Sequence, residues 1–331
     1  MSATNVAISA VNDKQQLKRK KRKKLLEKIW RYKVIYLFLL PSFFCIFVFS
    51  YIPMVGVLMA FQDYSISKGF IAILTSPFVG LKHFKELFSS FYFYTVFSNT
   101  VIISLLKLLF VFPAPLILAL LLNELRNVRF KRIVQTVTYL PNFLSYVVIS
   151  GLVAALISPS YGIINSIREA LGLNAVLFIG DPKYFRSIIV GIDVWQKTGV
   201  NAIVYLAAIT SINPELYESA IIDGASRFKQ AWHITIPEIM DVIILLFLFR
   251  IGHIMSAGGY MNEGFQTIFL LYSPPVYSVG DIIDTYVYRE GLVRGSYSFT
   301  TAVGLFKSVT GFILIILTNK LVKRFDRQGI W

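Results

Sequence analysis

An apolar run from Val34 to Phe61 is the feature that most limits what this chain can fold into. A hydrocarbon core about 30 Å thick is crossed by a helix of about 20 mainly apolar residues. The run is longer than that, and it also exceeds the roughly 7–15 apolar residues at the centre of a cleavable signal peptide. It therefore predicts a membrane-spanning helix that stays in the mature protein.

The composition extends this prediction to the whole chain. Of the 331 residues, 56% are hydrophobic and 15% are charged, whereas a soluble protein has about 45–50% apolar and about 25% charged residues. A soluble enzyme of this length lacks the polar surface it would need, so we predict an all-α integral membrane protein. The bilayer length criterion gives six spans, at residues 34–61, 95–122, 133–157, 185–210, 239–256 and 300–319.

The distribution of Lys and Arg predicts the orientation of these spans. With the N-terminus inside, the inner segments carry 21 Lys and Arg residues and the outer loops carry 7, which is the bias expected of cytoplasmic loops. Both termini are then cytoplasmic. The predicted organisation is a basic N-terminal extension at 1–33, a six-helix membrane domain at 34–322, and a cytoplasmic tail at 323–331.

The net charge of +15 does not indicate a nucleic-acid partner. Eleven basic residues lie between Lys14 and Lys33, directly before the first span, where they are expected to anchor the chain at the inner membrane surface. This segment fits both an amphipathic surface helix and a solvated cationic tail. The one cysteine, Cys45, lies inside the first span and is interpreted as a small hydrophobe. The three histidines are scattered, so we predict no metal site and no catalytic site.

The loop between the fourth and fifth spans, residues 213–237, carries the most specific pattern. Asn213 followed by Pro214 is a helix-start signal, and Gly224 is a natural helix stop because it adopts a left-handed conformation without steric cost. The pattern predicts a helix of about three turns, a bend, and a second helical stretch over Ser226–Ile234 that ends at Pro237.

The residues around that bend resemble the EAA loop of ABC importer inner-membrane permeases. The matching pattern is Glu218-Ser219-Ala220, three residues, Gly224, nine residues, and Ile234-Thr235-Ile236-Pro237. The family pattern has Ala at the second position and Leu before the proline, and Ser219 and Ile236 replace them here. Further segments are similar to the branch that imports oligo- or polysaccharides: Leu39-Leu40-Pro41, Thr138-Tyr139-Leu140-Pro141 and Phe325-Asp326-Arg327-Gln328-Gly329-Ile330-Trp331.

This resemblance implies a type I ABC importer permease in the bacterial cytoplasmic (inner) membrane. The chain would form half of a saccharide translocation path with a second permease subunit, and an extracytoplasmic solute-binding protein would deliver the saccharide. Two ATPase subunits would bind ATP and Mg and would contact the EAA loops as coupling helices. The chain lacks a phosphate-binding loop, so it is expected to bind no cofactor itself. The implied coupling residues are Glu218, Ala220, Asp223, Gly224, Ala225 and Pro237.

Polar residues inside the predicted spans are candidates for the substrate path, because a charge at mid-bilayer costs at least about 2.5–3.5 kcal/mol. They are Asp193, Trp195, Gln196, Lys197 and Asn201 in the fourth span, and Arg250 and His253 in the fifth. Asp193 and Lys197 are four residues apart, so they either neutralise one another or line a wet cavity. Lys107 either snorkels or faces the interior. Tyrosines in the last outer loop suit both membrane-interface anchoring and stacking on sugar rings.

Other functions fit the sequence less well. The same fold could serve a polyol or glycerol phosphate. An enzyme embedded in the membrane should show acidic or histidine clusters near the interface, and a scaffold would not explain charges in several spans. A secondary transporter would not need the spacing of the coupling loop.

Overall fold

The computed structural model describes residues 27–28, 30–66, 69, 71–259 and 263–324. Most of the basic extension and the segment Phe325–Trp331 lie outside the described residues. The described chain is helical, as predicted, with one isolated antiparallel bridge between Gln62 and Phe78.

The chain divides into two units, Met1–Leu58 and Met59–Trp331. The first unit holds the helix α2 (Lys33–Ile46) and the π-helical turn η1 (Phe47–Tyr51), and the 3-10 segment η2 (Ile52–Phe61) begins in it. Neither α2 nor η1 buries a residue, and large apolar side chains are exposed all around α2. A helix that is apolar on all sides and exposes its large side chains is typical of a membrane span.

The second unit contains the remaining helices. The longer ones are α4 (Lys82–Ser89), α5 (Phe91–Phe110), α6 (Pro113–Glu124), α7 (Val128–Tyr139), α8 (Tyr146–Leu156), α9 (Ile163–Ala170), α10 (Pro182–Thr210), α11 (Pro214–Ile222), α14 (Met240–Gly252) and α18 (Tyr297–Arg324). The shorter ones are α3 (Ala72–Thr75), η4 (Leu140–Phe143), α12 (Arg227–Gln230), η5 (Ala231–Thr235), α13 (Ile236–Glu238), η6 (Ile254–Ser256), α15 (Glu263–Phe269), η7 (Pro274–Val276), α16 (Tyr277–Gly280), α17 (Ile283–Val287) and η8 (Tyr288–Val293).

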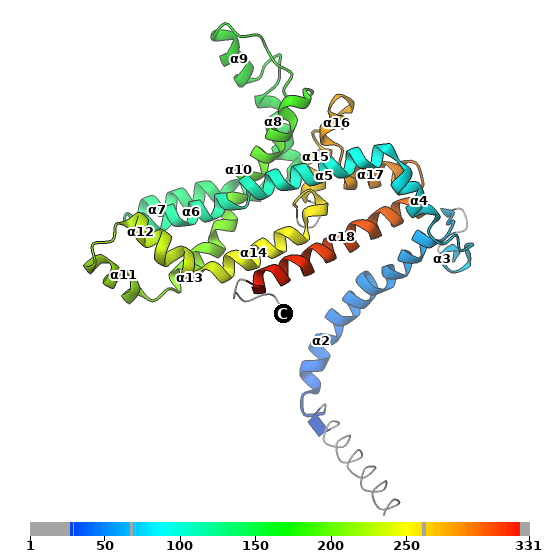
Figure 1. Cartoon of the computed structure of the whole chain (residues 1–331), viewed down its shortest axis with the longest axis horizontal. Coiled ribbons are helices and arrows are strands. Elements are labelled where there is room, and N and C mark those ends of the chain that lie inside the picture. The colour runs from blue at the N-terminus through cyan, green and yellow to red at the C-terminus, as the bar shows by residue number, and fades with distance from the viewer. Residues whose placement is uncertain (1–26, 29, 67–68, 70, 260–262, 325–331) are drawn as a thin grey trace, which may run out of the picture. The chain divides into compact units, whose positions relative to one another are not determined.

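Helix α10 is the central element of this unit. It packs most extensively on α6, and it also contacts α7, α5, α15 and α16. Figure 1 shows α5 and α6 in cyan running along one side of it, and α14 in yellow beside α18 in red. Gly199 lets α10 approach the end of α7 closely, because a Cβ atom there would lie 2.0 Å from the carbonyl oxygen of Thr138. Gly252 similarly lets α14 approach Ile315 on α18.

The described helices meet the length and hydropathy expected of a span in three places, Lys33–Phe61, Phe91–Glu124 and Tyr297–Arg324. These correspond to the first, second and sixth predicted spans. The pair Val128–Phe143 and Tyr146–Leu156 makes a fourth only if a helix bent by 103° counts as one span. The six-span count therefore stays a prediction.

The third, fourth and fifth predicted spans differ from simple apolar helices for identifiable reasons. In the third, Pro141 removes a backbone donor, Leu144 is extended with ψ of 138°, and Ser145 starts a new helix by capping Val148 N–H. In the fourth, α10 has 29 residues, enough for about 43 Å, but polar side chains interrupt it. In the fifth, α14 ends after 13 residues.

The close approach at Gly199 gives a stability prediction. We expect Gly199→Ala to lower the free energy of unfolding by about 1–3 kcal/mol, because the added methyl must push α10 away from the α7 backbone. The thermal unfolding midpoint of the purified protein measures this. Gly191→Ala on the same helix is the matched control, since nothing lies within 4 Å of its added Cβ. It should be neutral or stabilising by up to about 1 kcal/mol. Equal effects of the two changes would contradict the close packing.

Candidate functional site

A buried ion pair joins α5 to α10 in the interior of the second unit. Lys107 Nζ lies 2.8 Å from Asp193 Oδ2, and the two side chains are 0% and 1% exposed. Thr267 of α15 donates its hydroxyl to the other carboxylate oxygen of Asp193 at 3.2 Å. Lys107 therefore faces the protein interior and does not snorkel.

A second ion pair lies on the same helix. Lys197 Nζ binds Glu263 Oε2 of α15, and the ring of Tyr146 on α8 lies 5.9 Å from the ammonium group. Asp193 and Lys197 each have a direct ion-pair partner on another helix, while the charge of Lys197 also acts on Asp193. The two pairs connect α10 with α5 and α15.

Arg250 of α14 adds a third cation to this region. Its side chain is buried, and its charge acts on both Asp193 and Lys107. Among these five side chains, three cations face two carboxylates. A charge in the low-dielectric interior is costly unless it is paired, so the two ion pairs hold the helices together.

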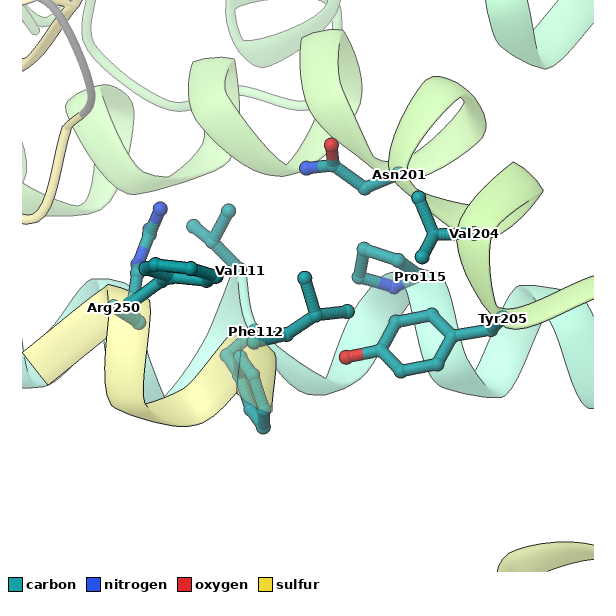
Figure 2. Close-up of a pocket in the computed structure, with 9 residues that line it drawn as sticks. Val111, Phe112, Pro115, Asn201, Val204, Tyr205 and Arg250 are labelled. Atoms are coloured by element: carbon teal, nitrogen blue, oxygen red, sulfur yellow. The ribbon is translucent and has the colours of Figure 1, made fainter. Parts of the chain in front are cut away.

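Arg250 also lines a cavity of about 300 Å³ beside the ion pairs, shown in Figure 2. Helices α6, α10 and α14 and the turn between α5 and α6 contribute its lining of Val111, Phe112, Pro115, Asn201, Val204, Tyr205, Leu246, Phe249 and Arg250. The amide of Asn201 comes from α10 and the guanidinium of Arg250 from α14, while apolar side chains form most of the remaining surface. A small-molecule site has this mixture of an apolar wall and a few polar groups.

The structure separates the seven predicted path residues into three groups. Asn201 and Arg250 share the cavity, and Asp193 and Lys197 hold the ion pairs. The other three lie elsewhere. Trp195 is 45% exposed, Gln196 is buried with its amide 3.5 Å from Leu144 O, and His253 Nδ1 lies 2.9 Å from the carbonyl oxygen of Phe249.

Glu263 and Tyr205 were missed by the sequence analysis. Glu263 lies in a segment assigned to the last outer loop, and 66 positions separate it from Lys197. Tyr205 is 2% exposed on α10. The neighbouring sequence does not reveal the role of either residue, because both roles depend on which helices pack against one another.

The loop at 213–237 folds at its first helix as predicted. The side chain of Asn213 accepts from Glu215 N–H at 3.1 Å and caps α11. At the other end Ala225 N–H donates to Ala220 O at 2.8 Å, and Gly224 N–H donates to Ile221 O at 3.1 Å. This is the Schellman arrangement, and it explains the glycine, whose φ is +75°.

The second helix of the loop is longer than predicted. It starts after Ser226, runs through α12, the π-helical turn η5 and α13, and ends at Glu238. One contact joins the two helices of the loop, and another fixes the loop to the rest of the protein. Tyr217 Oη lies 2.9 Å from Thr235 Oγ1, and Arg227 Nη1 lies 2.5 Å from Glu124 Oε2 at the end of α6.

The six predicted coupling residues lie around the bend of this loop and beyond it. Glu218, Asp223, Gly224 and Pro237 are exposed, and the two alanines are half-buried. Large apolar side chains are also exposed nearby, including Ile222 at 86% and the stacked pair Phe228 and Trp232, whose ring centroids are 6.5 Å apart. The loop thus offers an apolar surface and a carboxylate to a partner, and its contact role stays a prediction.

Comparisons with known proteins agree with this architecture. Residues 111–327 match the family described as "Binding-protein-dependent transport system inner membrane component". The polygalacturonan/rhamnogalacturonan transport system permease protein YteP of Bacillus subtilis is 41% identical over 95% of both chains. Protein LplB of the same organism is 43% identical over 91% of this chain and 92% of its own. A chain in the crystal structure of a bacterial alginate ABC transporter, in complex with an alginate-pentasaccharide-bound periplasmic protein, has a TM-score of 0.83 at 39% identity, covering 92% of this chain and 99% of that chain.

The Lys107–Asp193 pair gives a second stability prediction. Lys107→Met removes the cation and leaves a fully buried carboxylate unpaired, which should cost about 3–5 kcal/mol of unfolding free energy. The double variant Lys107→Met, Asp193→Leu should recover most of that loss, because it buries no unpaired charge. Thermal unfolding of the purified protein measures both.

Lys82→Met is the matched control, since its ion pair with Asp63 is about half-exposed and such pairs contribute at most about 1 kcal/mol. If Lys107→Met costs no more than Lys82→Met, the buried pair does not hold α5 to α10.

Proposed function

The chain belongs to the inner membrane components of binding-protein-dependent transport systems, and from this premise we propose that it forms half of a translocation path for an acidic oligo- or polysaccharide. It is a transport component rather than an enzyme. The single observation that carries the substrate path is the cavity of Figure 2, which a polar amide and a buried guanidinium line among three helices.

Two observations support an acidic saccharide. The guanidinium of Arg250 lines the cavity itself, and a cationic group in a cavity attracts an anionic substrate. The similar proteins named for their substrates include a polygalacturonan/rhamnogalacturonan permease and an alginate transporter, and galacturonan and alginate carry carboxylates.

We assign Glu218, Ala220, Asp223, Gly224, Ala225 and Pro237 to contact with an ATPase subunit. The bonds from Arg227 to Glu124 and from Tyr217 to Thr235 tie the loop to α6 and to the helix that leads into α14. A push on the loop then moves α6 and α14, whose residues line the cavity. Rigid-body movement of these packed helices would therefore couple the loop to the cavity.

The remaining assignments complete the proposed transporter. The residues 34–322 form six spans with both termini in the cytoplasm, flanked by a basic extension at 1–33 and a tail at 323–331. A second permease subunit forms the other half of the path. Two ATPase subunits hold ATP and Mg, and an extracytoplasmic solute-binding protein delivers the saccharide.

The coupling assignment predicts the behaviour of two loop variants. In the assembled transporter, reconstituted with its solute-binding protein, Glu218→Ala and Gly224→Asp should each abolish the stimulation of ATP hydrolysis by oligogalacturonates. Glu218→Ala removes the exposed carboxylate, and Gly224→Asp forces a side chain into a left-handed backbone, at about 1–2 kcal/mol of strain. ATPase activity across a panel of acidic saccharides, neutral saccharides, polyols and glycerol phosphate measures this.

Glu169→Ala on α9 is the control, because it removes a carboxylate outside the coupling loop and should leave the stimulation intact. Stimulation that survives both loop changes would remove this loop from the coupling. If only polyols or glycerol phosphate stimulate ATP hydrolysis, the substrate is one of these solutes and not a saccharide.

A further inference from the structure

Three tyrosines and an arginine form a cup that the substrate path does not use. The guanidinium of Arg289 lies over the rings of Tyr92, Tyr277 and Tyr286, at 5.7, 5.2 and 5.9 Å from their centroids. With Glu290 and Arg294 they line a cavity of about 450 Å³. These residues come from α5, α16, α17, η8 and the turn that follows η8. The predicted topology places the cup at the outer end of the membrane domain.

A buried carboxylate holds Arg289 in this position. Asp281, which is 0% exposed, accepts from Arg289 Nη2 at 2.6 Å and from Nη1 at 3.3 Å. Asp281 also accepts from the hydroxyls of Thr285, at 2.6 Å, and Tyr92. Burial disfavours the charged guanidinium, but the hydrogen bonds and charge of Asp281 outweigh it and raise the pKa of Arg289. The arginine is therefore charged and fixed in direction.

The backbone that carries the cup is fixed as well. The side-chain amide of Asn99 on α5 donates to the carbonyl oxygens of Ser278 and Asp281 at 3.1 Å. Arg186 on α10 donates to Val279 O at 3.0 Å and to Asn99 Oδ1 at 2.8 Å. Two long helices thus hold the segment between α16 and α17, so the cup exists before any ligand arrives. A preformed site loses less free energy to ordering on binding.

The cup retains capacity for a ligand. A guanidinium has five N–H donors, and within the described part of the chain Arg289 donates three hydrogen bonds, two to Asp281 and one to Tyr92. The Arg289 side chain is 20% exposed, and Tyr92 is 37% exposed. Glu290 is paired with Arg294 at 2.7 Å, so its charge is balanced at the rim.

We infer that this cup binds one carboxylate-bearing sugar unit of the saccharide before it enters the translocation path. A sugar ring offers an apolar face that packs on a tyrosine ring, while its hydroxyls reach polar groups at the edge. The carboxylate of a uronate accepts a charge-assisted hydrogen bond from Nε–H or from the second Nη1–H of Arg289, the two donors that Asp281 and Tyr92 do not use. This inference rests on the proposed function, and it adds a second, outer subsite to the cavity between the spans.

An acidic side chain of the solute-binding protein would present the same carboxylate. The structure favours the sugar, because the arginine lies among aromatic rings within a cavity whose volume suits a small molecule. A site for a protein side chain would not distinguish an acidic saccharide from a neutral one. The experiment therefore compares the binding of these two kinds of saccharide.

The test is the equilibrium binding of trigalacturonate and of neutral galactotriose to the assembled transporter in lipid nanodiscs, without the solute-binding protein. The wild type should bind trigalacturonate at least about tenfold more tightly, as expected of a charge-assisted hydrogen bond. Arg289→Lys keeps the charge beside Asp281 but removes the further N–H donors of the guanidinium, and Tyr277→Ala removes one ring. Both variants should lose most of this selectivity.

Two matched controls lie on the loop between α8 and α10. Arg168→Lys changes an arginine that also lies over a ring, 5.8 Å from Phe178, and Tyr161→Ala removes a tyrosine that is 75% exposed. Both should keep wild-type selectivity.

Three results would overturn the inference. They are selectivity that survives in both cup variants, equal losses for the acidic and the neutral sugar, and a wild type that binds neither sugar. If any of these occurs while oligogalacturonates still stimulate ATP hydrolysis, the cup fails and the proposed function stands. If no saccharide stimulates the wild type, the proposed function fails first.

Discussion

The buried pair of Lys107 and Asp193 is the interaction on which the interior of the membrane domain depends. Neither side chain could be buried alone in its charged form, because an unpaired ion in a low-dielectric interior destabilises the folded protein by several kcal/mol. Their contact at 2.8 Å fixes α5 against α10. The pair of Lys197 and Glu263 brings α15 to the same helix, and Arg250 adds α14. The cavity is lined by α10 and α14 together with α6 and the turn between α5 and α6.

Apolar side chains alone would not produce an interior cavity lined by polar groups. Apolar packing is close and tends to eliminate voids, whereas charges that must be paired keep polar groups in the interior. In the predicted orientation, the cup around Arg289 lies at the outer end of the membrane domain and the loop at 213–237 at its inner end. Asn99 and Lys107 both lie on α5, so one helix contacts both the segment that carries the cup and the central ion pair. The proposed outer subsite, the cavity and the proposed coupling loop are thus linked through packed helices.

The parts that the sequence predicted well are those with local signals. Asn213 and Gly224 set the limits of α11 because a cap and a left-handed glycine act within a few residues. The break in the third span had local signals too, in Pro141 and Ser145, but the apolar composition concealed it. The ion pairs could not be predicted. Asp193 and Lys197 share a helix face, and only the packing of other helices decides that each binds a more distant partner.

The most direct test of the account is whether saccharide reaches the cavity of Figure 2. Because Cys45 is the only cysteine of this chain, Cys45→Ser gives a permease chain without thiols. Asn201→Cys is then added to this chain. Ile203→Cys on the same helix, 44% exposed and outside the cavity lining, is the control. The measurement is the rate of reaction with a charged, membrane-impermeant thiol reagent in the assembled transporter. We predict that trigalacturonate slows the reaction at position 201 and leaves position 203 unchanged. A position 201 that never reacts, or whose rate ignores the saccharide, would contradict the proposed path.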